Sequence, residues 1–269
     1  MDLSILANEI NEAKPEDKRC IKKACAYVKK SRFHQCDDSA LLIIKEKYVL
    51  LGVFDGVSGE ANASTASETA LKTIAEYIEK NFKTKKSEDF EGLLQNAVED
   101  ANLKINKGGT TATIVLILED GSYFYANVGD SHVYVFNNGN VIRLTKDDRD
   151  SSSTAIYFAA RMVITQSLGY LIKNIDVGKG KLSKGNMIFT VTDGIIDNLF
   201  VKIEGGILID TSGKEDLEEM LKECKSTEEF VKMLSEEVKK RMQLKEQIAI
   251  DGKAFVPKED DAAIAILQY

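Results

Sequence analysis

The amino-acid sequence predicts an α+β fold in which antiparallel strands and helices share one core. Between residues 109 and 145, short β-branched and aromatic runs alternate with turns rich in Gly, Asp and Asn, which is typical of an antiparallel meander. Apolar residues recur at helical spacing within 62–82 and 88–105, and two further helices are expected at about 214–223 and 227–245. Strand-like segments extend from residue 41 to residue 268, so early and late parts of the chain must share sheets. This distribution favours one domain over two.

The N-terminal part of the chain is predicted to form an amphipathic helix. Within residues 16–30, the side chains of Ile21, Ala24, Cys25 and Val28 recur at helical spacing, and Lys and Arg occupy the other face. We interpret the basic face as a solvated surface, and contact with an acidic partner is the alternative.

The sequence contains no internal repeat, no low-complexity segment and no Pro/Gly-rich linker. Residues 40–54 are expected to form two strands around a polar turn at 45–47, and residues 186–192 another strand. Ser226 and Glu229 have the spacing of a capping box, which predicts the start of the helix at 227–245. A last strand is expected after Asp260 and Asp261.

Composition excludes several classes of function. The 269 residues include 36 Lys and Arg against 43 Asp and Glu, and a net charge of −7 argues against a dedicated nucleic-acid-binding protein. No apolar run reaches the length of a membrane span, and the acidic N-terminus does not resemble a signal peptide. We therefore expect a cytoplasmic protein with no nucleic-acid or membrane partner.

The chain is poor in histidine and cysteine. The two histidines, His34 and His132, exclude a zinc site built on several imidazoles. The four cysteines form no C-x-x-C motif, so we expect reduced, mostly buried thiols. Carboxylates are the abundant reactive groups, which favours hard divalent cations if the protein is an enzyme.

Acidic residues recur at the ends of predicted strands. The set consists of Asp37, Asp38, Asp55, Asp130, Asp193, Asp260 and Asp261. Any one of them is explained by a turn, because Asp-Gly is a common turn sequence. If the strands lie side by side, however, the carboxylates converge and need a cation to offset their repulsion. Mg²⁺ or Mn²⁺ held in this way favours hydrolysis of a phosphate ester by metal-bound hydroxide over acyl transfer.

Six short motifs resemble, in order, those of the metal-dependent serine/threonine protein phosphatases of type 2C. They cover the chain from about residue 31 to its end, and each is weak alone. The motifs are VFDGVSGE at 53–60, GGTTATIVLI at 108–117, NVGDSHVYVFNNGNVIRLT at 127–145, ITQSLG at 164–169, FTVTDGIIDNL at 189–199 and EDDAAIAIL at 259–267. The resemblance implies a four-layer α-β-β-α sandwich, with two antiparallel sheets flanked by helices and a metal site at one end.

The resemblance also implies roles for individual residues around two or three Mn²⁺ or Mg²⁺ ions. Asp55 would bridge two metals, Gly56 would offer its carbonyl oxygen, and Asp193 and Asp260 would complete the first metal's ligands. Asp38 or its neighbour Asp37 would serve the second metal, and Asp130 a weaker third one. Asp197 matches an acid that supports the ligands, and Arg32 matches the phosphate-binding arginine in an ambiguous register.

The implied reaction is hydrolysis of phosphoserine or phosphothreonine in a protein substrate by the metal-bridging hydroxide, with no phosphoenzyme. Asp55, Asp193 and Asp260 would be its catalytic residues. A core domain at 31–269 would carry the site, with the helical extension at 1–30 packed on it, and we expect a monomer. The segment at 146–162, where the family has a variable flap, is short.

Several positions depart from the family pattern. Val57 stands where some members have a histidine proposed as the general acid, and Ser58 replaces a glycine. His132 replaces an arginine, and Asp148 stands where a histidine is expected. These departures keep two alternatives open: a pseudophosphatase that binds phosphoproteins as a regulatory scaffold, and an unrelated metal-dependent phosphoesterase acting on small molecules.

Overall fold

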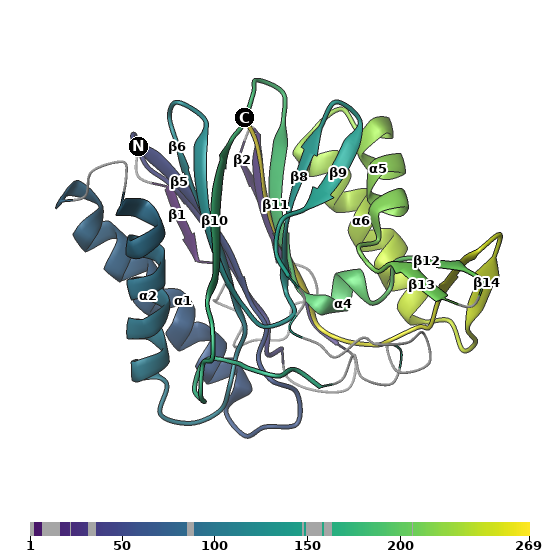
Figure 1. Ribbon diagram of the computed structural model, residues 1–269, viewed down its shortest axis with the longest axis horizontal. Coiled ribbons are helices and arrows are strands. Elements are labelled where there is room, and N and C mark those ends of the chain that lie inside the picture. The colour runs from purple at the N-terminus through teal and green to yellow at the C-terminus, as the bar shows by residue number, and fades with distance from the viewer. Residues whose placement is uncertain are drawn as a thin grey trace.

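The computed structural model shows two antiparallel sheets packed face to face, with helices on both outer faces (Figure 1). It describes residues 3–6, 17–21, 23–31, 36–84, 89–146, 148, 158, 163–205 and 207–269. The predicted four-layer α-β-β-α sandwich is confirmed.

Each of the two large sheets has six strands and combines distant parts of the chain. The first has the order β1 (Leu3–Leu6), β4 (Ser39–Ile44), β5 (Tyr48–Phe54), β6 (Ala112–Leu118), β7 (Ser122–Val128) and β10 (Asp176–Lys181). The second has the order β2 (Asp17–Ile21), β3 (Ala24–Lys29), β16 (Ala262–Gln268), β11 (Met187–Val191), β8 (His132–Asn137) and β9 (Asn140–Arg143). Neighbouring strands are antiparallel throughout both sheets.

Side chains that alternate along each strand belong to different layers of the core. On β5, Leu51 and Val53 belong to the apolar cluster between the sheets, while Leu50 and Phe54 belong to the cluster beneath the first helix pair. Successive strand side chains point to opposite faces, so a strand covered on both sides is apolar at nearly every position. This explains why the sequence of β5 is a continuous apolar run.

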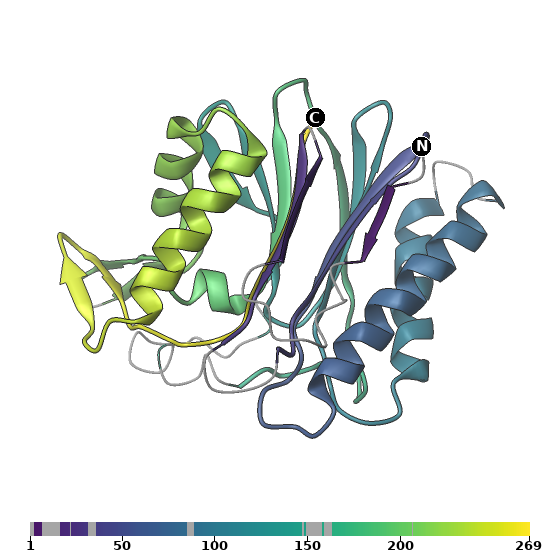
Figure 2. The same ribbon diagram turned by 180° about the vertical axis from the view of Figure 1, so that it is seen from behind.

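Two helix pairs cover the outer faces of the sheets (Figure 2). Helices α1 (Ala63–Asn81) and α2 (Phe90–Lys104) pack on the first sheet, and α5 (Lys214–Glu223) and α6 (Thr227–Met242) pack on the second. In the helix predicted at residues 62–82, an apolar stripe formed by Ala66, Ala70, Ile74 and Ile78 is buried. At the start of α6, Ser226 accepts a hydrogen bond from the Glu229 N–H at 3.1 Å, as the capping box predicts.

The helix predicted at residues 16–30 is wrong, because this segment forms the antiparallel pair β2–β3. All six residues of β3 are buried. Cys25 and Tyr27 face the layer beneath α5 and α6, while Ala26 and Val28 face the first sheet. An apolar run this short fits helix and strand periods about equally, and pairing with β16 decides between them. The segment is thus part of the sheet and not a helical extension packed outside it.

The expectation of four reduced thiols is also wrong. Cys25 is disulfide-bonded, whereas Cys36 and Cys224 are free. In the β2–β3 pair, Cys20 is the residue whose Cα lies opposite Cys25.

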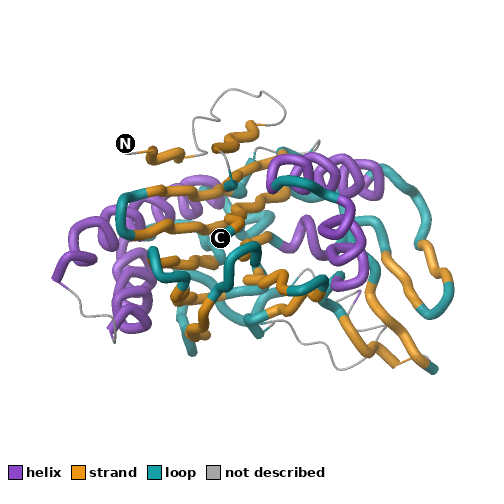
Figure 3. The backbone as a smooth tube through the Cα atoms, turned by 90° about the horizontal axis from the view of Figure 1, so that it is seen from above, coloured by secondary structure: helices purple, strands orange, loops and turns teal. Residues whose placement is uncertain are grey.

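Several elements were not predicted. A third sheet of four short strands lies beside the second helix pair and has the order β13 (Ile207–Asp210), β12 (Val201–Glu204), β15 (Lys253–Phe255) and β14 (Ile248–Ile250). Figure 3 shows these strands at the right-hand edge of the molecule, apart from the two large sheets. The 3₁₀ turn η1 (Phe82–Thr84) and the short helix α4 (Asp193–Ile196) complete the described elements. None of the helices in the described part of the chain is both long and apolar enough to cross a bilayer.

Candidate functional site

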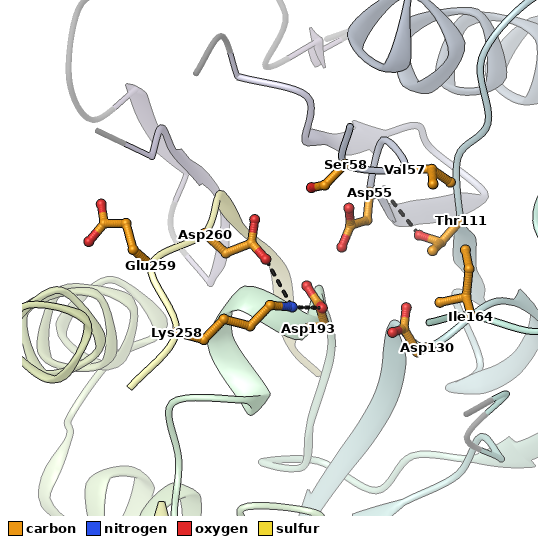
Figure 4. Close-up of a pocket in the computed structure, with 10 residues that line it drawn as sticks. All are labelled: Asp55, Val57, Ser58, Thr111, Asp130, Ile164, Asp193, Lys258, Glu259 and Asp260. Carbon is orange, nitrogen blue, oxygen red and sulfur yellow. Dashed lines mark hydrogen bonds and ion pairs between the residues drawn. The ribbon is translucent and has the colours of Figure 1, made fainter. Parts of the chain in front are cut away.

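An acidic cleft of about 230 Å³ lies at one end of the sheet sandwich (Figure 4). The residues that line it are Asp55, Val57, Ser58, Thr111, Asp130, Ile164, Asp193, Lys258, Glu259 and Asp260. Because adjacent strands run in opposite directions, the C-terminal ends of β5 and β11, the β7–β8 turn and the start of β16 meet at the same end of the sandwich. This arrangement brings together acids that are far apart in the sequence.

Asp55, Asp130 and Asp193 form the centre of the cleft. Each offers one carboxylate oxygen, and these three oxygens lie within 4.8 Å of one another. Thr111 helps to position two of the three segments. Its hydroxyl receives the Asp55 N–H at 3.0 Å and lies 2.9 Å from the Ser131 hydroxyl, next to Asp130.

Crowding of acids changes their protonation. Burial, followed by the charges of Asp38 and Asp193, raises the pKa of Asp55 well above its usual value. Burial and the charge of Asp193 also raise the pKa of Asp260, to about 6. The cleft therefore holds more negative charge than its surroundings compensate, which is the condition that a bound cation relieves.

Of the adjacent acids Asp37 and Asp38, the structure brings Asp38 into this group. Asp38 is 5% exposed, and burial together with the charges of Asp261 and Asp260 raises its pKa well above the usual value. Its carboxylate accepts a hydrogen bond from the Thr192 hydroxyl at 2.8 Å. The Asp37 carbonyl oxygen accepts the Gly56 N–H at 3.2 Å, so the backbone of Asp37 positions the segment that follows Asp55.

Gly56 sits in this segment because no larger residue fits. A Cβ atom at Gly56 would lie 2.8 Å from the carbonyl oxygens of both Asp37 and Ala63. Real Cβ atoms do not approach oxygen so closely, so the turn after β5 requires glycine here.

A cation that the sequence analysis missed, Lys258, enters the cleft. Its Nζ lies 2.9 Å from Asp260 Oδ2 and 3.1 Å from Asp197 Oδ2, and it also contacts Asp193 Oδ2. Figure 4 shows the ammonium between Asp193 and Asp260. The sequence shows a lysine two residues before Asp260, but whether its side chain points into the cleft depends on the fold.

A family model described as Protein phosphatase 2C matches residues 30–249. The chain belongs to the protein phosphatase 2C family. This confirms the resemblance seen in the six motifs. The family is metal-dependent, and the acidic cluster of Asp55, Asp130 and Asp193 agrees with that property.

Relatives with curated names match part of the chain. Serine/threonine phosphatase stp of Listeria innocua is 28% identical over 126 residues, which cover 43% of this chain and 50% of that protein. Protein phosphatase 2C homolog 1 of Saccharomyces cerevisiae is 29% identical over 181 residues, which cover 60% and 58%. The chain thus spans about half the length of the curated relatives it matches.

Solved structures show the same fold over nearly the whole chain. A PPM Ser-Thr phosphatase from Mycobacterium smegmatis, in complex with cacodylate, has a TM-score of 0.66 at 20% identity and covers 93% of this chain and 99% of its own. A serine/threonine phosphatase from Mycobacterium tuberculosis has a TM-score of 0.67 at 17% identity, with 93% and 100% covered.

Within this 2C phosphatase fold, the departures from the family pattern fall into two groups. Val57 and Ser58 line the cleft, so they can affect the chemistry there. His132 is fully buried in β8, and its Nδ1 lies 3.0 Å from the Thr145 hydroxyl, which indicates a structural role. Asp148 accepts hydrogen bonds from the Gly129 N–H at 2.9 Å and from Gln166 at 2.6 Å, and so holds the turn that carries Asp130. Arg32 and His34 lie outside the described residues.

Proposed function

We propose that this protein hydrolyses phosphoserine and phosphothreonine in protein substrates, using Mg²⁺ or Mn²⁺ bound in the acidic cleft. The observation that supports this most directly is the convergence of Asp55, Asp130 and Asp193 within 4.8 Å. Membership of the protein phosphatase 2C family supports the reaction and the substrate class.

The residues of the cleft fit a hard divalent cation. Carboxylate and carbonyl oxygens are the ligands that Mg²⁺ and Mn²⁺ prefer. The pKa values of Asp38 and Asp55 are raised by burial and then by repulsion from neighbouring acids, and a cation would offset that repulsion. We infer that Asp55, Asp193 and Asp260 would hold one ion, and that the Gly56 carbonyl oxygen would be a further ligand of the site. Asp55 and Asp38, in preference to Asp37, would hold a second. Asp130 would contribute to a weaker third.

The bound ions would supply charge that neutralises phosphoryl oxygens and would make a water molecule acidic enough to attack phosphorus. The protein's own groups would orient that water through carboxylates such as Asp55 and Asp130. Among the described residues that line the cleft, none is a cysteine, and none is a histidine that could activate the Ser58 hydroxyl as a nucleophile; the Thr111 hydroxyl is already hydrogen-bonded to Asp55 and Ser131. This lining favours direct attack by water, with no phosphoenzyme.

Protonation of the leaving serine or threonine oxygen falls to solvent in this proposal. Val57 lines the cleft where some family members have a histidine, and its side chain carries no proton to donate. Arg32 remains our candidate for binding the phosphate, on the basis of its place in the sequence alone.

The test is hydrolysis of a phosphothreonine peptide with and without Mn²⁺. We expect Mn²⁺-dependent release of phosphate, reduced at least about a hundredfold by Asp193→Asn, since loss of one preorganised charged group in an active site has effects of this size. Asp251→Asn is the matched control, because Asp251 is an exposed turn residue with φ 48°. No hydrolysis with Mn²⁺, or unchanged hydrolysis by Asp193→Asn, would refute the proposal. Faster turnover of sugar or nucleotide phosphates than of the peptide would instead indicate a small-molecule phosphoesterase.

One observation favours the pseudophosphatase alternative. The ammonium of Lys258 already contacts Asp193 and Asp260, which are two of the proposed metal ligands. A scaffold of this kind would bind phosphopeptides without hydrolysing them. Isothermal titration with the same phosphothreonine peptide, combined with the hydrolysis assay, separates the two functions. Light scattering on the same sample tests our expectation of a monomer.

A further inference from the structure

The side chain of Lys258 lies in the cleft as a cation among three acids. Its Nζ is 2.9 Å from Asp260 Oδ2, 3.1 Å from Asp197 Oδ2 and in contact with Asp193 Oδ2. The lysine side chain is only 12% exposed, and that of Asp197 is fully buried. An ammonium has three N–H donors, and here each one can meet a different carboxylate.

The fold directs Lys258 inward. Asn198 binds its backbone on both sides, accepting the Lys258 N–H at 3.0 Å and donating to the Lys258 carbonyl oxygen at 2.8 Å. The Asn198 amide also donates to the Gly194 carbonyl oxygen at 2.9 Å, so it ties Lys258 to helix α4. Asp193 and Asp197 are four residues apart at this helix and therefore lie on the same side of it. The three contacts of the ammonium follow from this arrangement.

Two of the three acids that contact Lys258, Asp193 and Asp260, are acids that the proposed function assigns to a metal. A divalent ion would need Asp193 and Asp260 at about 2.0–2.2 Å, which is closer than an ammonium approaches. An ion held by Asp193 Oδ2 and Asp260 Oδ2 and an ammonium in contact with these same two oxygens exclude each other. On the opposite side of Asp193, oxygens of Asp55 and Asp130 are not contacted by Lys258 in the described structure.

We propose that Lys258 is a built-in competitor of the divalent cation at Asp193 and Asp260. In the metal-free protein its ammonium offsets part of the charge of the acids, and a metal ion binds there only by displacing it. This inference rests on the proposed metal site. It predicts that the protein takes up Mn²⁺ at this position more weakly than the same ligands would without the lysine, because only the population with Lys258 displaced is competent to bind.

Calorimetric titration of the full chain with Mn²⁺ tests the competition. We expect Lys258→Met to bind Mn²⁺ at least about tenfold more tightly than the unchanged protein, or to bind one more ion, since it removes the competitor and keeps an apolar stem of similar length. Lys258→Arg retains the charge and is expected to give no such gain. Lys179→Met is the matched control for net charge, because Lys179 pairs with Glu91 on an exposed surface.

A second measurement uses the unchanged protein and does not depend on how a variant folds. An amine-reactive ester followed by mass spectrometry reports the access of Lys258 to solvent. We expect slow labelling of Lys258 without metal and faster labelling with saturating Mn²⁺, at a constant rate for Lys179. Labelling that is unchanged or slower with Mn²⁺ contradicts displacement of the lysine.

The possible failures are distinguishable. Equal, measurable Mn²⁺ affinity and stoichiometry in the unchanged protein and in Lys258→Met overturn the competition and leave the proposed phosphatase intact. Absence of Mn²⁺ binding in both overturns the competition and the proposed metal site together.

Discussion

The carboxylate of Asp261 accepts the backbone N–H of Asp37 at 2.6 Å, joining two segments from opposite ends of the chain. Its second oxygen accepts the backbone N–H of Ser31 at 2.5 Å. Asp261 follows Asp260 directly, and Asp37 precedes Asp38. A residue that does not itself line the cleft thus sets the spacing of two acids of the candidate metal site.

Replacing Asp261 with asparagine is expected to weaken this junction. The amide has one acceptor oxygen in place of two, so either the buried N–H of Ser31 or the partly buried N–H of Asp37 loses its partner. Leaving such a group unpaired costs about 1–3 kcal/mol. We expect a loss of this size in the free energy of unfolding, measured with urea in saturating Mn²⁺ so that repulsion among the acids is neutralised. Asp251→Asn, at an exposed turn, serves as the control, and equal stability of the two variants would contradict the role of Asp261.

Asn198 is predicted to be important for stability, although it touches no proposed metal ligand through its side chain. It is fully buried and hydrogen-bonds to the Lys258 backbone twice and to the Gly194 carbonyl oxygen once. Asn198→Ala leaves these groups without partners and is expected to cost about 2–4 kcal/mol in the free energy of unfolding. Urea denaturation measures the loss. The exposed Asn140, changed to alanine, is expected to lose less than about 0.5 kcal/mol.

The N-cap of α6 gives a prediction that depends on local structure alone. Ser226 accepts the Glu229 N–H, and the Glu229 carboxylate accepts the Lys225 N–H at 2.8 Å. Ser226→Ala is expected to destabilise the protein by about 1 kcal/mol, the usual effect of losing a serine cap. Ser235→Ala is the control within the same helix, because the Ser235 hydroxyl donates to the Lys232 carbonyl oxygen and caps nothing. A control that loses as much stability as Ser226→Ala would contradict the cap.

The apolar periodicity of the sequence predicted those elements that bury only one face. The stripes of α1 and α2 and the cap at Ser226 were predicted because each helix buries one face. The hairpin β2–β3 was not predicted. Strand β3 is covered on both faces, so its apolar residues do not alternate with polar ones. Strand β10 was missed for a different reason. Gly178 and Gly180 lower its strand propensity, and the rings of Tyr125 and Tyr123 on β7 occupy the space that side chains would otherwise fill.

The candidate site also has features that the sequence predicts and features that it does not. That acids would gather was predictable, because strand ends converge in an antiparallel sandwich. The burial of Asp38 near Asp55 and Asp260 was not, since adjacent residues point in different directions and only the fold decides which of the two lies near the other acids. The contact of Lys258 with Asp193 depends on a segment 65 residues away in the sequence and on how Asn198 holds it. A short sequence motif contains neither the distance between two such residues in the fold nor the direction in which their side chains point.

The raised pKa of Asp260 predicts how the metal-free protein responds to pH. Its value of about 6 in the folded chain lies above the usual 3.8, because burial and the charge of Asp193 oppose ionisation. Between these two values the folded state binds more protons than the unfolded state, so stability falls as pH rises. From this group alone we expect the metal-free protein to gain about 1 kcal/mol between pH 7.5 and pH 5.0. Urea denaturation in EDTA at the two pH values measures the gain.

Asp260→Asn isolates this effect from the other carboxylates of the cleft. The amide does not ionise, so the variant is expected to lack the gain of the unchanged protein on acidification. Saturating Mn²⁺ is expected to reverse the sign, because the ion binds the ionised acids and protons then compete with it. If the unchanged protein and Asp260→Asn respond identically to pH in EDTA, Asp260 does not titrate near 6. Its carboxylate would then be compensated within the fold by Lys258, 2.9 Å away, more strongly than the raised pKa implies.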